Sequence, residues 1–94
     1  MSQPVYLTAE ALQEEADAYL YYERISESLG EKFLIEVERV LHNVSKNPTY
    51  YSFIDTTQTI RSVALKTFPF TIIYEQKNNF IVVYHVHHTR KKLP

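Results

Sequence analysis

Apolar residues recur at helical spacing over most of the first half of the chain. The first such stretch follows a short β-prone run, residues 5–7, and Thr8 is well suited to cap the helix that begins there. We expect this helix to end near Ile25 and to bury one stripe of side chains. The stripe consists of Leu12, Ala16, Tyr19, Leu20 and Tyr22 or Glu23.

A second amphipathic helix is predicted from its cap at Ser26 to Asn47, because the residue before Pro48 disfavours helical backbone. The single glycine, Gly30, falls inside the apolar stripe, which makes it an interior helical residue at a cost of about 1 kcal/mol relative to alanine. A close approach of the two helices in an antiparallel hairpin would explain that cost. The stripe consists of Leu29, Phe33, Leu34, Val37, Val40, Leu41 and Val44.

The second half changes to the alternating pattern that is typical of β-strands. A loop over 49–59, anchored by Tyr50, Tyr51 and Phe53, leads to predicted strands at 62–67, 71–76 and 80–87. Pro69 marks the first bend, and Lys77-Asn78-Asn79 forms the second turn. The last strand is apolar on both faces except at His85, so we expect it inside the sheet. The order β-α-α-β-β-β predicts an α+β fold, a helical hairpin packed on a largely antiparallel sheet, in one domain over 1–94.

Composition narrows the class of protein. Ninety-four residues, of which 45% are hydrophobic, suit one small core, and the absence of cysteine excludes disulfides and thiolate metal sites. No apolar run has membrane-spanning length, and no signal segment is visible, so we expect a cytoplasmic protein without membrane contact. The net charge of −1 hides an asymmetry between the two halves of the chain. The first half (1–48) has nine acidic and four basic residues, and the second half has two acidic and six basic residues. The overall basic balance of a nucleic-acid binder is absent, although a local basic face remains open.

Two clusters in the second half are candidates for chemistry. Three histidines end the last strand, but His85 and His87 share a face that His88 does not, and no carboxylate lies nearby in the sequence. We therefore expect no metal and no cofactor, whereas acid–base chemistry by one histidine stays open. The basic residues either converge on the sheet face that the helices leave open, where they would bind phosphates or carboxylates, or form a solvated edge. They are Arg61, Lys66, Arg90, Lys91 and Lys92. On the first helix, at least one of Tyr19, Tyr21 and Tyr22 should be exposed.

The order of these segments resembles the RelE/ParE superfamily of bacterial type II toxins over nearly the whole chain. The resemblance rests on the helical runs AEALQEEADAYLYYERIS and SLGEKFLIEVERVLHNVSKNP, the strand FIVVYHV, and a set of single positions. It implies a growth-inhibiting plasmid-stabilisation toxin that a co-encoded antitoxin neutralises, by folding a disordered and often acidic tail onto the sheet and the helices. It also implies a homodimer or a toxin–antitoxin hetero-oligomer. The single positions are Arg61, Leu65, Phe68-Pro69-Phe70, Ile72, Tyr74 and His88-Thr89-Arg90.

The resemblance favours the ParE-like branch, whose members inhibit DNA gyrase by protein contact and need no catalytic residues. RelE-like members instead cut messenger RNA on the ribosome, with a cluster of lysine and arginine and often a C-terminal tyrosine. This chain has Thr71 where that branch commonly has a basic residue, and it lacks a terminal tyrosine. In the alternative of a nuclease, phosphate binding and proton transfer would fall to Arg61, Lys66, His88 and Arg90. A third interpretation is a former toxin that is retained only as an antitoxin-binding module.

Overall fold

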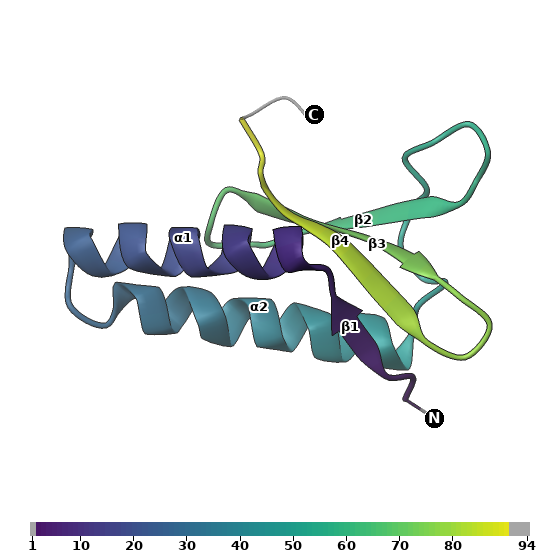
Figure 1. Ribbon diagram of the computed structural model, residues 1–94, viewed down its shortest axis with the longest axis horizontal. Helices are drawn as coiled ribbons and strands as arrows, with labels where there is room; N and C mark the ends of the chain where they lie inside the picture. The colour runs from purple at the N-terminus through teal and green to yellow at the C-terminus, as the bar shows by residue number, and fades with distance from the viewer. Residues whose placement is uncertain (1, 91–94) are drawn as a thin grey trace.

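Two antiparallel helices pack on a mixed four-stranded sheet in the computed structural model, which describes residues 2–90 (Figure 1). The strands lie in the order β1-β4-β3-β2, with β1 parallel to β4 and the other neighbours antiparallel. The predicted α+β fold and element order are confirmed. The elements are β1 (Val5–Leu7), α1 (Ala9–Ile25), α2 (Leu29–Lys46), β2 (Ile60–Ala64), β3 (Phe70–Gln76) and β4 (Ile81–His88).

The start of α1 is as predicted, but the start of α2 is not. The Thr8 hydroxyl accepts a hydrogen bond from the Ala11 N–H at 3.1 Å. Ser26 ends α1, and α2 begins only after Ser28, which has the left-handed φ of 64° and makes no side-chain cap. The tight reversal between the helices needs that conformation. A carboxylate of the neighbouring helix supplies the missing cap, since Glu23 Oε1 accepts from the Gly30 N–H at 2.7 Å.

Gly30 lies at a close contact between the two helices. A Cβ atom at this position would lie 2.7 Å from the Tyr19 carbonyl oxygen and 2.6 Å from Glu23 Cγ. The Glu23 side chain is able to move, but the carbonyl belongs to the backbone of α1. The expected close approach is therefore the reason for a glycine in this helix.

Replacing Gly30 by alanine should lower the free energy of unfolding by about 1–2 kcal/mol. Overpacking costs about 1–3 kcal/mol, which the better helix propensity of alanine offsets only in part. Urea unfolding measures the change, with Glu31→Ala on the exposed side of the same helical turn as the control. A Gly30→Ala protein as stable as the wild type would contradict the tight contact.

The buried face of α1 matches the predicted stripe at Tyr22 but differs from it elsewhere. Ala11, Ala18 and Tyr22 are buried, whereas Leu12 and Leu20 are 53% and 51% exposed. Hydrogen bonds that Thr8 and Glu14 make with β4 fix the rotation of the helix about its axis. The small alanines then allow close packing on the sheet, which is why the apolar spacing alone was wrong about Leu12, Ala16 and Leu20.

A β-bulge in β4 sets which of its side chains face the helices. Ile73 pairs with His85, and Tyr74 pairs with Val83, so that Tyr84 is the extra residue. As a result Val83 and Val86 are both buried although they are three residues apart. His88 pairs with Phe70 and shares the helix-facing side, whereas His85 and His87 lie on the opposite side.

The strand β2 begins at Ile60 and ends at Ala64, whereas the sequence predicted a strand over 62–67. The buried carboxylate of Glu36, on α2, accepts hydrogen bonds from the N–H groups of Thr67 and Phe68 at 3.0 and 3.4 Å. These bonds hold the chain away from the β-ladder. They also place Phe68 and Phe70 over the helices.

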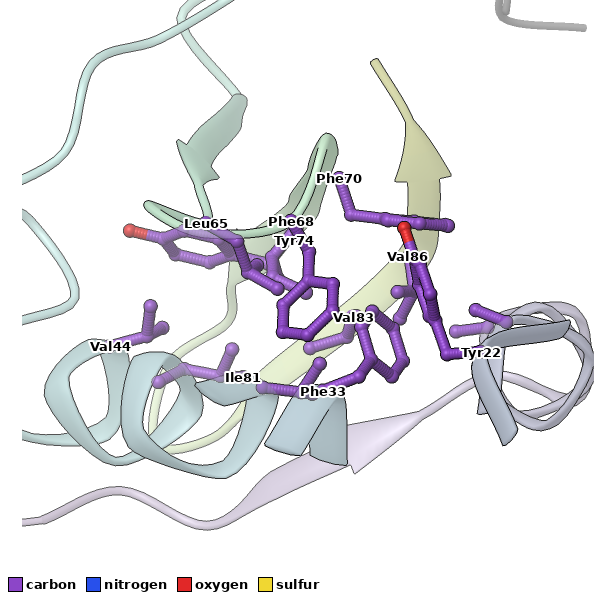
Figure 2. Close-up of a cluster of buried hydrophobic side chains, with 14 residues drawn as sticks. Tyr22, Phe33, Val44, Leu65, Phe68, Phe70, Tyr74, Ile81, Val83 and Val86 are labelled. Carbon is purple, nitrogen blue, oxygen red and sulfur yellow. The ribbon is translucent and has the colours of Figure 1, made fainter. Parts of the chain in front are cut away.

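The core joins both helices to the sheet and contains a cluster of aromatic rings among aliphatic side chains (Figure 2). Phe33 lies at its centre, with ring centroids 5.5, 5.4 and 5.1 Å from those of Tyr22, Phe68 and Phe70. Tyr74 lies at the far end, where its hydroxyl donates to the Pro48 carbonyl at 2.7 Å. Burial raises the pKa of Tyr74 to about 12. The cluster therefore fixes both α1 and the turn after β2 relative to α2 and β3.

Candidate functional site

The edge of β4 beyond β1 is occupied by polar groups of α1. The strand β1 pairs with β4 only as far as Val83. Beyond it, the Thr8 hydroxyl donates to the Tyr84 carbonyl at 3.1 Å, and the Val86 N–H donates to Glu14 Oε1 at 3.0 Å. Satisfied edge groups of this kind block the addition of a further strand. This part of the sheet therefore does not offer the open edge that an extended peptide would need.

The histidines at the end of β4 have separate environments. His85 Nδ1 lies 3.2 Å from Glu14 Oε1. His88 Nδ1 accepts a hydrogen bond from the Arg90 N–H at 3.2 Å, and its ring lies edge-on to Phe70. Within residues 2–90, no group of three or more acidic, histidine or cysteine side chains is arranged to hold a metal ion.

A cavity of about 410 Å³ opens between α1 and the end of β4. Its α1 wall includes Glu14, Asp17 and Tyr21, and its sheet wall includes Phe70, Val86 and His88. Tyr21 is 60% exposed, which confirms that one tyrosine of this helix faces solvent. The cavity thus combines carboxylates with aromatic rings beside the predicted site residues.

Three of the four candidate site residues lie at the same end of the sheet. Lys66 is exposed in the turn between β2 and β3, while His88 and Arg90 lie at and just beyond the end of β4. A hydrogen bond of 2.7 Å from the Thr89 N–H to the Pro69 carbonyl ties these two segments together. Lys91 and Lys92, which were expected to join this group, lie outside the described residues.

The fourth candidate, Arg61, is bound to the loop that follows α2. Its guanidinium donates to the carbonyls of Tyr51 and Thr49 at 2.6 and 3.2 Å and lies 3.8 Å from the centroid of the Phe53 ring. Arg61 is paired with the buried Tyr74, on the helix-facing side of β2, so it does not lie on the open face of the sheet, which was one of the two arrangements that the sequence allowed for the basic residues. The expected convergence of the basic residues is only partial.

Comparison with solved structures identifies the fold. The chain is similar to a chain of the chromosomal ParDE TA system from P. aeruginosa, with a TM-score of 0.81 and 13% identity over 95% of this chain and 98% of that one. It is also similar to YoeB from Staphylococcus aureus, with a TM-score of 0.65 and 11% identity over 93% and 97% of the two chains. The chain has the RelE/ParE toxin fold. No protein-family model matches the sequence, and no curated protein is significantly similar to it.

Within the RelE/ParE fold of this chain, two sets of contacts hold the loop 49–59. Arg61 binds the beginning of the loop, and Asp55, which belongs to the loop, binds its end. The Asp55 carboxylate accepts hydrogen bonds from the N–H groups of Thr59 and Ile60, both at 2.9 Å. Of the three predicted anchors, Tyr51 packs against the core and Phe53 stacks on Arg61. Tyr50 is 80% exposed and anchors nothing in the core, so that prediction is wrong.

Replacing Arg61 by alanine should lower the free energy of unfolding by about 2 kcal/mol, because two charge-assisted hydrogen bonds and one cation–π contact are lost. Amide hydrogen exchange in 49–54 should accelerate more than exchange in β3. Lys66→Ala, a basic residue in an exposed turn, should change stability by less than about 0.5 kcal/mol. Equal effects of the two substitutions would refute the structural role of Arg61.

The sequence analysis missed the two acidic residues, Glu36 and Glu14, that bind the turn between β2 and β3 and the end of β4 in this RelE/ParE fold. Glu36 carries a signal, since a carboxylate interrupts the core-facing stripe of α2 beside Phe33 and Val37. Glu14 carries none, because its partners on β4 lie 71 and 72 positions away in the sequence. The sequence signal for the cavity is the group of tyrosines on α1, from which we expected only that at least one ring is exposed.

Proposed function

We propose that this protein is the toxin of a bacterial type II toxin–antitoxin module and that it inhibits DNA gyrase by protein contact. The observation that carries the proposal is the full-length likeness to a ParDE chain, whose TM-score of 0.81 exceeds the 0.65 for YoeB. A co-encoded antitoxin would neutralise the toxin in the cytoplasm, where gyrase acts. Within residues 2–90, neither helix has the length and apolar character of a membrane span.

The geometry of the site supports protein contact over RNA cleavage. Cleavage of a phosphodiester needs a base, an acid and phosphate-binding cations that converge on one point. Arg61 is bound to loop carbonyls, and the Nδ1 atom of His88 accepts a backbone N–H. The adjoining cavity carries the carboxylates of Glu14 and Asp17, which repel phosphate. These features favour a surface that binds a protein.

A ribosome-dependent mRNA endonuclease is the second candidate. It is favoured by the location of Lys66, His88 and Arg90 at one end of the sheet. This activity would need those three residues without Arg61. An antitoxin-binding protein without toxicity is the third interpretation, and the same experiment separates all three.

Induced expression in a bacterial host tests the proposal. We expect growth arrest with double-strand DNA breaks and an SOS response, both suppressed by the product of a short neighbouring open reading frame. Lys66→Ala should retain the DNA breaks, because the gyrase mechanism does not use this lysine as a catalytic group. Codon-linked mRNA cuts that disappear in Lys66→Ala would replace the proposal with the nuclease. Unimpaired growth with intact antitoxin binding would leave only the third interpretation.

A further inference from the structure

We propose that the cavity between α1 and the end of β4 receives an arginine or lysine side chain from a partner polypeptide. This inference deepens the proposed function and rests on it in one respect, namely that the protein acts through polypeptide partners. It specifies the chemistry that such a partner brings to one place on the surface. It also differs from the expectation of an acidic partner segment drawn from the resemblance.

Charge is the first reason to expect a basic group. Asp17 and Glu14 lie one helical turn apart on the same wall of the cavity. Asp17 accepts a hydrogen bond from the Gln13 amide at 2.8 Å, and Glu14 is held by Val86 and His85. No lysine or arginine in the described part of the chain forms an ion pair with either carboxylate. Within residues 2–90, this wall therefore has the imidazole of His85, beside Glu14, as its possible cationic partner.

The aromatic rings are the second reason. Tyr22 and Phe70 are almost fully buried under the cavity, and Tyr21 stands edge-on to Tyr22 with ring centroids 5.2 Å apart. Ring faces attract ammonium and, better, planar guanidinium groups. The methylene stem of the same side chain suits the apolar surface of Ala18 and Val86. The carboxylates and rings thus suit the guanidinium of an arginine, and the apolar surface beside them suits its methylene stem.

The direction of the chain after β4 favours a separate polypeptide as the source of this side chain. The Thr89 N–H donates to the Pro69 carbonyl at 2.7 Å, which draws the chain toward the turn before β3. The Arg90 N–H then donates back to His88 Nδ1. The described chain therefore leaves β4 on the side of β3 and away from the α1 wall.

The test is an NMR titration of the full chain with N-acetyl-arginine amide, and N-acetyl-citrulline amide is the uncharged control of nearly equal shape. We expect saturable shifts confined to the amides of 14–22 and 86–88, with citrulline binding at least about fivefold more weakly. Asp17→Asn should weaken arginine binding by about fivefold. Glu10→Gln, an exposed acid outside the cavity on the same helix, should leave it unchanged.

Equal binding of the two amides, or arginine-induced shifts outside the cavity, would overturn the proposal. So would tighter arginine binding by the Lys91→Gln/Lys92→Gln variant, because the protein's own tail would then be the occupant. Failure here is distinguishable from failure of the toxin function, which is assayed by growth. A toxic protein that ignores arginine refutes only the cavity proposal, and a harmless one that binds arginine refutes only the toxin proposal.

Discussion

Replacing Phe33 by alanine should lower the free energy of unfolding by about 3–5 kcal/mol. Phe33 is fully buried and contacts rings from α1, from the turn after β2 and from β3 (Figure 2). Its removal would leave a cavity that rigid neighbours on three sides cannot fill. Because small domains are stable by only about 5–15 kcal/mol, the variant should be partly unfolded at 37 °C.

Thermal and urea unfolding measure this effect, and Tyr50→Ala is the matched control. Tyr50 is a similar aromatic residue that is 80% exposed, so its loss should change stability by less than about 0.5 kcal/mol. A Phe33→Ala protein that unfolds within about 1 kcal/mol of the wild type would show that the aromatic cluster does not join the helices to the sheet.

Replacing Glu36 by glutamine should lower the free energy of unfolding by about 1.5–3 kcal/mol at neutral pH. Glutamine keeps the shape and one oxygen acceptor, so the change isolates the negative charge. The charged carboxylate accepts hydrogen bonds from the N–H groups of Thr67 and Phe68 and so fixes the chain after the end of β2. Burial and, to a lesser degree, the charge of the exposed Glu38 raise the pKa of Glu15. Glu38 is therefore a control whose charge is unfavourable in the folded protein. Glu38→Gln should therefore be neutral or slightly stabilising.

The effect of Glu36 should depend on pH in a defined direction. Burial raises the pKa of this carboxyl, but the hydrogen bonds from Thr67, Phe68 and Lys66 outweigh burial and leave it below its ordinary value of 4.5. A lowered folded-state pKa stabilises the protein fully above 4.5, and that contribution is lost as the pH falls through the folded-state value. Urea unfolding from pH 7 to pH 3 should show the gap between wild type and Glu36→Gln narrowing below pH 4.5. A gap that widens would contradict this linkage.

The fold followed from local patterns that tertiary contacts did not override. Each pattern describes one segment of the chain: the helical spacing around Phe33 and Val37, the break at Pro48, and the strand patterns of the second half. Each of these segments has the predicted type. The near-continuous apolar character of the last strand predicted an interior strand, and β4 does lie between β1 and β3, with Ile81, Val83 and Val86 buried and its other residues partly buried.

The details of the site depend on contacts between distant segments, which no local pattern records. The rotation of α1 is set by Glu14 reaching the edge of β4, and the aim of His88 is set by a bulge at Tyr84. Arg61 is one of the positions on which the family resemblance rests, but its side chain donates to loop carbonyls ten and twelve residues earlier in the chain. The sequence directed attention to Lys66, His88 and Arg90 at one end of the sheet, whereas the contacts of Glu14 and Glu36 at the same end became clear only from the structure.

The most direct measurement is the supercoiling of relaxed plasmid by purified DNA gyrase with this protein titrated in. Our account predicts loss of supercoiling at protein concentrations comparable to that of gyrase, and recovery when the antitoxin is added. Unchanged gyrase activity, together with cleavage of messenger RNA on programmed ribosomes by the same preparation, would contradict it.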